Sequence, residues 1–322
     1  MIKNSIKKVC LFLMGFIVID IVLLGALLIF CNYFRSEEYS LAKNYPESEF
    51  LIFGTSHAQE SFVSNALSDE IKKSVYNFGR ARRNIFFNYY LSVFLIDQAR
   101  KPDHICIVMS YNDFRETTRP YMVSQFVPKG EGFSLFYSLL IQKKWTSMRN
   151  FFYTDLFSSS YRMMISRSMS WLKNRKREIP YWEDAERGYR GDDSILSEYE
   201  EPEEFPTHKF KAYSMQKEYL INTIRLWKNA GCNVIITDTP EFIGTRLSEI
   251  EYEQYSALME KIASEEGATF KSFNDPKIGL LSDHTSFKDG GWGVPNSHLN
   301  KKGANQFTKL FAQWLISISK DK

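Results

Sequence analysis

The stretch EFLIFGTSHAQ, from Glu49 to Gln59, decides how the rest of the chain is interpreted. Its apolar run ends at Gly54, as buried strands often do, and the residues that follow favour a helix. Ser56 is therefore predicted to lie at a strand-to-helix turn, beside the positive end of the helix dipole. A serine at such a turn can act as a nucleophile if a base reaches its hydroxyl. The alternative is a helix cap, a role that suits both Thr55 and Ser56.

Strands and helices alternate along the rest of the chain. Apolar residues at helical spacing predict helices over 84–100, 214–230 and 248–266, and another at the C-terminus. Strands are predicted at 74–79, 104–113, 233–242 and 268–273. This alternation indicates a parallel sheet with helices on both faces and a site beyond the carboxyl ends of the strands. Ser56, Gly79 and Asn112 are expected at that edge, and the residues from Asp283 to the last helix are expected to form a long loop.

The N-terminus has the features of a membrane anchor. The apolar run from Val9 to Cys31 is long enough to span a bilayer, and no small-residue cleavage site follows it. Lysines in the first eight residues precede the run, which predicts a cytoplasmic N-terminus and an extracytoplasmic location for everything after residue 35. Asp20 interrupts the run. It indicates a membrane partner or a protonated carboxyl group, or else it is simply tolerated in a strongly apolar helix.

Composition and charge divide the chain and exclude some functions. Residues 1–35 are interpreted as a cytoplasmic tip and signal anchor, the polar residues 36–48 as a stalk, and residues 49–322 as one domain. This domain contains an insertion at about 131–210, aromatic and helical at first and then highly charged. The formal net charge of +3 is too small to indicate a nucleic-acid partner. The four cysteines suggest neither a disulfide framework nor a metal site, and no cofactor is expected.

The C-terminal sequence NSHLNKKGANQFTKLF contains His298 and resembles the last motif of the SGNH (GDSL-type) hydrolase superfamily. Three further stretches then fall in the order of that family's motifs: GTSH at 54–57, NFG at 77–79 and SYND at 110–113. The resemblance covers the chain from about Glu49 to its end, apart from the insertion. It implies a flavodoxin-like three-layer α/β/α sandwich with a helical insertion.

The resemblance also implies roles for particular residues. Ser56 would be the nucleophile and His298 its base, with oxyanion donors from the Ser56 amide, the Gly79 amide and the Asn112 side chain. Such chemistry needs a hydroxyl, a base of near-neutral pKa and donors aimed at a developing oxyanion. The alternatives are a structural hydrogen bond for His298 and a turn or cap for Asn112.

The chain departs from the family pattern at two positions. Thr55 replaces the aspartate that usually precedes the serine, and Pro295 replaces the aspartate three residues before the histidine, which orients the ring. Asp289 is then the candidate orienting acid and Asp283 a poorer one. Asn296 or a backbone carbonyl group is a further alternative.

Membrane-anchored domains that resemble this family suggest acyl transfer to or from a cell-envelope glycopolymer through an acyl-enzyme on Ser56. Ester hydrolysis is the close alternative, and an inactive scaffold for polymer export is the non-enzymatic one. The expected partners are an envelope polysaccharide or an acylated small molecule, and a multi-span membrane acyltransferase contacted through the segment around Asp20. Arg80, Arg82 and Arg83, predicted at the start of a helix, are candidates for binding an anionic substrate or are simply solvated.

Overall fold

The computed structural model describes the chain from the end of the predicted stalk to the last helix, with gaps. The described residues are 45–81, 83–99, 101–114, 187–195, 209–242, 247–274, 283–289 and 295–320, together with 15, 42 and 280. No helix among them is long and apolar enough to cross a membrane. The predicted anchor, including Asp20, lies outside the described residues except for Gly15, and most of the predicted insertion lies outside them too.

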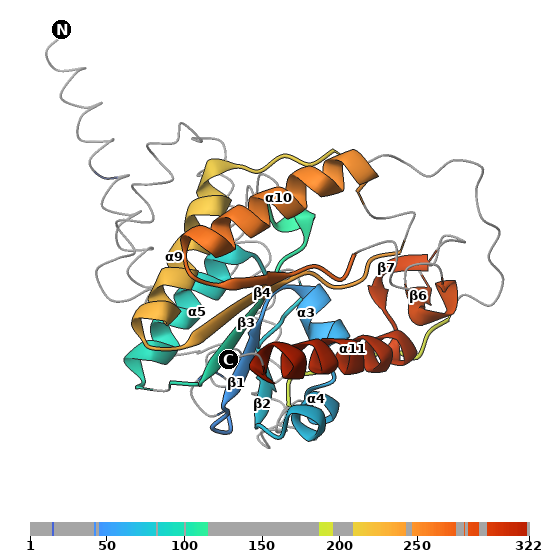
Figure 1. Cartoon of the computed structure of the whole chain (residues 1–322), viewed down its shortest axis with the longest axis horizontal. Coiled ribbons are helices and arrows are strands. Elements are labelled where there is room, and N and C mark those ends of the chain that lie inside the picture. The colour runs from blue at the N-terminus through green and yellow to red at the C-terminus, as the bar shows by residue number, and fades with distance from the viewer. Residues whose placement is uncertain are drawn as a thin grey trace, which may run out of the picture.

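A five-stranded parallel sheet forms the centre of the fold (Figure 1). Its strands are β1 (Phe50–Phe53), β2 (Val75–Asn77), β3 (His104–Val108), β4 (Asn233–Thr237) and β5 (Thr269–Lys271). They lie in the order β2-β1-β3-β4-β5, and every neighbouring pair is parallel. This is the flavodoxin-like strand order. The chain adds β2 on one side of β1 and β3 to β5 on the other, and such a switch point opens a site beyond the carboxyl ends of β1 and β3. The predicted α/β architecture is therefore confirmed.

Helices cover both faces of this sheet (Figure 1). One face carries α5 (Ile85–Asp97), α9 (Ser214–Asn229) and α10 (Glu249–Glu265), and the other carries α3 (Ser56–Ser61), α4 (Ser64–Ile71) and α11 (Lys301–Lys320). Side chains alternate along the strands, so Leu51 and Phe53 pack toward α5 and α9 while Phe50 and Ile52 pack toward α3 and α11. Both faces are apolar because both are buried, as expected for a parallel sheet.

A second, two-stranded sheet lies in the region predicted to be a loop. The antiparallel strands β6 (Phe287–Asp289) and β7 (Pro295–Leu299) follow a short 3-10 turn, η6 (His284–Ser286), and precede α11. We call β6 and β7 the His298 ribbon, because β7 carries that histidine. Another 3-10 turn, η1 (Tyr111–Phe114), follows β3 directly.

One prediction about the edges of the domain needs qualification. Tyr45, in the predicted stalk, is buried and packs its ring against Tyr76 and Phe78, so the end of that segment is part of the domain. The described residues 187–195 belong to the charged part of the predicted insertion, which was not expected to be helical, and they contain no helix. This segment, which we call the strap, crosses from the end of β2 to the start of α11.

Candidate active site

Ser56 lies where the sequence predicts, at the turn between β1 and α3. Gly54 permits this turn because its φ is +156°, and a Cβ there would come within 2.7 Å of Ala58 Cβ and 2.9 Å of the Val108 carbonyl oxygen. Thr55 is the N-cap residue of α3, but its side chain makes no capping hydrogen bond. Ser56 is the first residue of the helix, and its hydroxyl points to the side chain of His298. The structure therefore does not support a capping role for either side chain.

His298 meets Ser56 across 242 positions of sequence. Its Nε2 lies 2.6 Å from Ser56 Oγ, and its Nδ1 lies 3.1 Å from Ser297 Oγ. In a neutral ring that accepts the Ser56 proton at Nε2, the hydrogen is on Nδ1 and can be donated to Ser297. Burial lowers the pKa of His298, the negative charge of Glu60 opposes this shift and the positive charge of Lys288 adds to it. The ring is therefore a base held in its neutral form near neutral pH.

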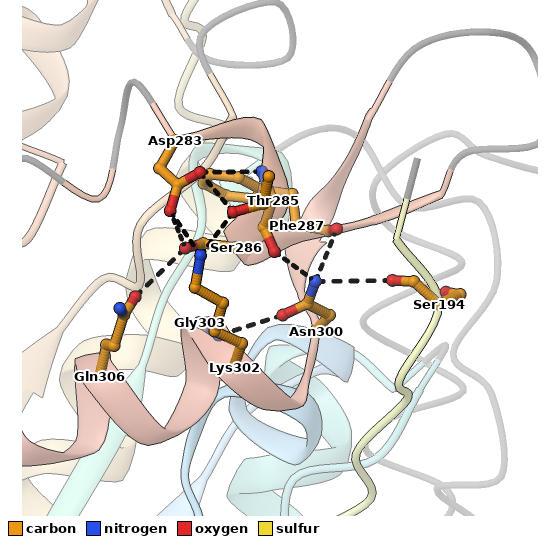
Figure 2. A network of polar contacts seen from close by, with 9 residues as sticks. All are labelled: Ser194, Asp283, Thr285, Ser286, Phe287, Asn300, Lys302, Gly303 and Gln306. Atoms are coloured by element: carbon orange, nitrogen blue, oxygen red, sulfur yellow. Dashed lines mark hydrogen bonds and ion pairs between the residues drawn. The ribbon is translucent and has the colours of Figure 1, made fainter. Parts of the chain in front are cut away.

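A network of polar contacts holds the His298 ribbon to the start of α11 (Figure 2). Asn300 is central to it: its Nδ2 donates to the carbonyl oxygens of Thr285 at 2.8 Å and Phe287 at 3.0 Å, and its Oδ1 accepts from the Gly303 amide at 3.1 Å. Gly303 is needed at this contact, because a Cβ there would come within 2.1 Å of the Ser286 carbonyl oxygen. The motif residues after His298 thus fix the strand that carries it.

Asp283 belongs to the same network rather than to the His298 ring. Its carboxylate accepts hydrogen bonds from the Thr285 amide, Ser286 Oγ and Lys302 Nζ (Figure 2). Partial burial acts to raise the pKa of Asp283, but the hydrogen bonds from Thr285, Lys302 and Ser286 lower it to about 2. Asp283, the poorer of the two candidate acids, therefore organises the turn before the ribbon.

Asp289, the preferred candidate acid, lies at the end of β6 with its side chain exposed. It is paired in register with Pro295, three residues before His298. One contact at Nδ1 of the ring is with Ser297 Oγ. Orientation of His298 by Asp289 thus stays a prediction, and the side chain of Asn296 lies outside the described residues.

The predicted oxyanion donors follow β2 and β3 at the same edge of the sheet as Ser56. Gly79 lies close against α3, where a Cβ would come within 2.5 Å of the Gln59 amide nitrogen. Its own amide donates to Asn77 Oδ1 at 2.8 Å. Asn112 is exposed in η1, and its backbone amide donates to Ser110 Oγ at 3.2 Å. The oxyanion roles of Ser56, Gly79 and Asn112 stay predictions.

The three arginines differ from what the sequence predicts. They precede the helix instead of opening it, because α5 begins at Ile85, with Asn84 as its N-cap accepting from the Phe87 amide. Arg80 donates to the backbone carbonyl oxygen of Gly79 at 2.6 Å and also contacts that of Asn77. These contacts tie it to the backbone around β2. The guanidinium group of Arg83 lies 5.2 Å from the ring centroid of Phe87, and Arg82 lies outside the described residues.

The strap connects the Ser56 side of the site with the His298 side. Its Arg187 carbonyl oxygen accepts from the Asn77 amide at 2.9 Å, and its Arg190 amide donates to the Gln59 carbonyl oxygen at 3.0 Å. Further along, the Asp192 carbonyl oxygen accepts from the Lys301 amide at 2.8 Å. Residues from the far end of the predicted insertion thus bridge α3 and α11.

A buried polar cluster that the sequence did not predict lies beside His298. It consists of His57, Ser110, Thr239 and Glu241, which are 7%, 4%, 2% and 2% exposed. Glu241 Oε1 accepts from Ser110 Oγ at 3.0 Å and lies 3.9 Å from His57 Nε2. The available signals were a second histidine directly after Ser56 and a polar stretch directly after β4. Among the described residues, no three histidine, cysteine or acidic side chains are placed to hold a metal ion.

Comparisons with known proteins give only a distant likeness. No protein-family model and no curated protein sequence matches the chain. One similar solved structure is a protein assigned as an acylhydrolase from Bacteroides fragilis, 10% identical with a TM-score of 0.39, over 88% of this chain and 97% of that one. Another is a GDSL-like lipase from Bacteroides thetaiotaomicron, 11% identical with a TM-score of 0.36, over 89% of this chain and 99% of that one. At these TM-scores the likeness does not assign the chain to a family.

Proposed function

We propose that the protein is a serine esterase-type enzyme of the SGNH kind, with Ser56 as nucleophile and His298 as general base. The observation that carries this proposal is the 2.6 Å contact between Ser56 Oγ and His298 Nε2 at the carboxyl edge of a parallel sheet. A serine is activated when a base of near-neutral pKa is within hydrogen-bonding distance of its hydroxyl. The pKa of His298 is lowered by burial, so the ring is available as that base at neutral pH.

The proposed reaction passes through an acyl-enzyme. Ser56 Oγ attacks the carbonyl carbon of an ester while its proton moves to His298 Nε2. Collapse of the tetrahedral intermediate breaks the ester bond, and the protonated His298 gives this proton to the departing alkoxide. A second hydroxyl group, from water or from a sugar, then attacks the acyl carbonyl carbon while His298 takes its proton. The bond to Ser56 Oγ breaks, and His298 returns the proton to Ser56 Oγ. Water makes the enzyme a hydrolase and a sugar hydroxyl makes it a transferase.

We further propose that the acyl group is exchanged with a cell-envelope glycopolymer outside the membrane. Support for this comes from the sequence, in which the apolar run from Val9 to Cys31 and the lysines before it favour an anchor with the rest of the chain outside. A reporter enzyme fused after Lys322 should then be active only outside the cytoplasm. Reporter activity inside the cytoplasm would exclude envelope chemistry but leave the esterase proposal intact.

A fluorophosphonate probe tests the acyl-enzyme directly. The full-length chain, purified in a mild detergent, should be labelled on Ser56, and Ser56→Ala should abolish labelling. His298→Ala should reduce it severely, and Asn112→Ala should slow it by about ten- to a thousandfold if its side chain stabilises the oxyanion. Ser317→Ala is a matched control, since that exposed hydroxyl lies in α11 and donates to the Trp314 carbonyl oxygen one turn earlier.

The scaffold hypothesis predicts a different result. A folded wild-type protein that reacts with neither the probe nor a panel of acyl esters would contradict the proposed chemistry. The Ser56 variant should keep the wild-type melting temperature, because the substitution removes no core volume. An equal loss of labelling in Ser317→Ala would show that the assay reports on folding rather than on the Ser56 hydroxyl.

A further inference from the structure

His57 covers one face of the His298 ring. The centroids of the two imidazole rings are 4.3 Å apart and their planes differ by 16°, so the rings are stacked. Because His57 directly follows Ser56 on α3, one short helix contacts the base in two ways. Ser56 contacts the edge of the ring at Nε2, and His57 lies against its face.

His57 is in turn held by residues that follow β3 and β4. Its Nδ1 lies 3.3 Å from Thr239 Oγ1, and its Nε2 lies 3.9 Å from Glu241 Oε1. Glu241 accepts a hydrogen bond from Ser110 Oγ, and its backbone amide donates to Asn274 Oδ1 at 2.8 Å. The stacked ring therefore contacts two residues that follow β4, and one of them, Glu241, is tied through Ser110 to the end of β3.

We propose that His57 is a positioning residue, whose ring sets the plane of His298 and excludes water from one face of the base. This inference rests on the proposed function, in which His298 takes the proton of Ser56. Hydrogen bonds at the two ring nitrogens constrain the edge of His298, whereas the stack constrains its tilt. Small displacements of a reacting group slow the reaction strongly, so a constraint on the tilt of His298 contributes to the rate.

The protonation state of His57 is consistent with this role. Burial, and to a smaller extent the nearby His298, lower the pKa of His57 well below its usual value. His57 thus stays neutral, and it does not repel the positive charge that forms on His298 when that ring takes the Ser56 proton. The other charged groups around the pair are Glu60 and Lys288 on the His298 side and Glu241 behind His57.

Two substitutions separate the ring face from the polar contacts of His57. His57→Asn keeps polar atoms for Thr239 and Glu241 but removes the ring, whereas His57→Phe keeps a ring face and removes the polar atoms.

The readout is the rate at which a fluorophosphonate labels Ser56 in the full-length chain as a function of pH. We expect His57→Asn to slow labelling by about tenfold or more. The midpoint of its pH profile should also move up toward the ordinary histidine pKa of about 6.5, because water reaches the exposed face. His57→Phe should recover most of the rate and the wild-type midpoint.

Either of two results would overturn the proposal. One is a folded His57→Asn variant with the wild-type rate and midpoint. The other is a His57→Phe variant as slow as His57→Asn, with an unchanged midpoint in both. A merely structural histidine would lower the melting temperature of these variants without moving the midpoint.

A second measurement does not depend on activity. If the wild-type chain is not labelled, the proposed function fails, but the pKa of His298 can still be measured by NMR. The chain has five histidines, so the His298 signal is assigned as the one missing from His298→Gln. His57→Asn should raise the pKa of His298 and His57→Phe should not. An unchanged pKa in His57→Asn would overturn the positioning role by itself.

Discussion

Ser56 and His298 form one hydrogen bond but lie on two segments that are held in place by different interactions. The Ser56 segment is placed by packing: β1 is buried on both faces, and Gly54 and Gly79 let neighbouring backbones approach α3 closely. The His298 ribbon is short, and it is organised by side-chain hydrogen bonds that Asp283 accepts and Asn300 donates. The nucleophile is thus held by the core and the base by a polar network. Single polar substitutions should therefore affect the base far more than the nucleophile.

Asn300→Ala should give the largest effect of this kind. It removes the donor to the Thr285 and Phe287 carbonyl oxygens and the acceptor for the Gly303 amide, in a site where Asn300 is 1% exposed. Buried groups left without partners cost about 1–3 kcal/mol each, so we expect the free energy of unfolding to fall by about 2–4 kcal/mol. Labelling of Ser56 should slow by more than about tenfold as the ribbon loosens.

Asn305→Ala is the matched control for that variant. Its side chain makes an exposed hydrogen bond to the Lys301 carbonyl oxygen one turn back in the same helix. Denaturant unfolding should show a change within about 0.5 kcal/mol, and labelling should keep its rate. Wild-type labelling in Asn300→Ala would show that the ribbon is held by something other than this network, and the contrast between the two segments would fail.

The sequence predicted the packed segment well because packing leaves a periodic signal. The apolar run before Gly54 and the helical spacing after residue 84 correspond to β1 and α5, and the strand at 233–242 corresponds to β4. The alternation also predicted a parallel sheet, whereas the flavodoxin-like architecture was implied by the resemblance. The main error here concerned Arg80 and Arg83, which lie before α5 and not in its first turn, because the side chain of Asn84 caps that helix.

The polar segment could not be predicted in the same way. The strands of the ribbon are short and largely polar, so PNSHL shows no alternation that would indicate a strand. The sequence motif identified His298 but did not predict which residues surround its ring. The partners of His57 are Thr239 and Glu241, more than 180 positions away in sequence, and only the fold brings them together. The identity of the group at Nδ1 of His298 is likewise a matter of local geometry.

Ser297→Ala and Asp289→Asn test which residue orients His298 through its Nδ1. Ser297 Oγ lies 3.1 Å from His298 Nδ1, whereas Asp289 is exposed at the end of β6. We expect Ser297→Ala to lower kcat by about five- to tenfold, the effect of losing one hydrogen bond of ~1 kcal/mol. Asp289→Asn should have the smaller effect. Steady-state kinetics on an activated ester would measure both.

The reverse order would support the acid predicted from the sequence. A fall of kcat by orders of magnitude in Asp289→Asn, with the melting temperature unchanged, would show that a carboxylate fixes the tautomer of His298. Ser297 would then be a neighbour of the ring without a role in its orientation. Melting temperatures should be measured for both variants, since neither side chain belongs to the apolar core.

The smallest effect we expect comes from the ion pair that joins the two segments. Lys288 in the ribbon lies 3.0 Å from Glu60 of α3 and 3.4 Å from Asp192 of the strap. Burial has the largest effect and lowers the pKa of His298. The charge of Glu60 opposes this shift, and the charge of Lys288 adds to it. Labelling requires neutral His298, so its rate should fall with acidification around a midpoint below about 6.5.

Substituting the two charges should move that midpoint in opposite directions. Glu60→Gln removes the charge that favours protonated His298, so the midpoint should shift to lower pH. Lys288→Gln removes the charge that disfavours it, so the midpoint should shift to higher pH. Each shift should be less than about one unit, because the two opposite charges pair with each other and so partly cancel at His298. Lys261→Gln, which removes an exposed charge paired with Glu265 on α10, is the control and should leave the midpoint unchanged. Shifts of the same sign in Glu60→Gln and Lys288→Gln would show that the ion pair acts by holding the ribbon against α3 and not through its charges.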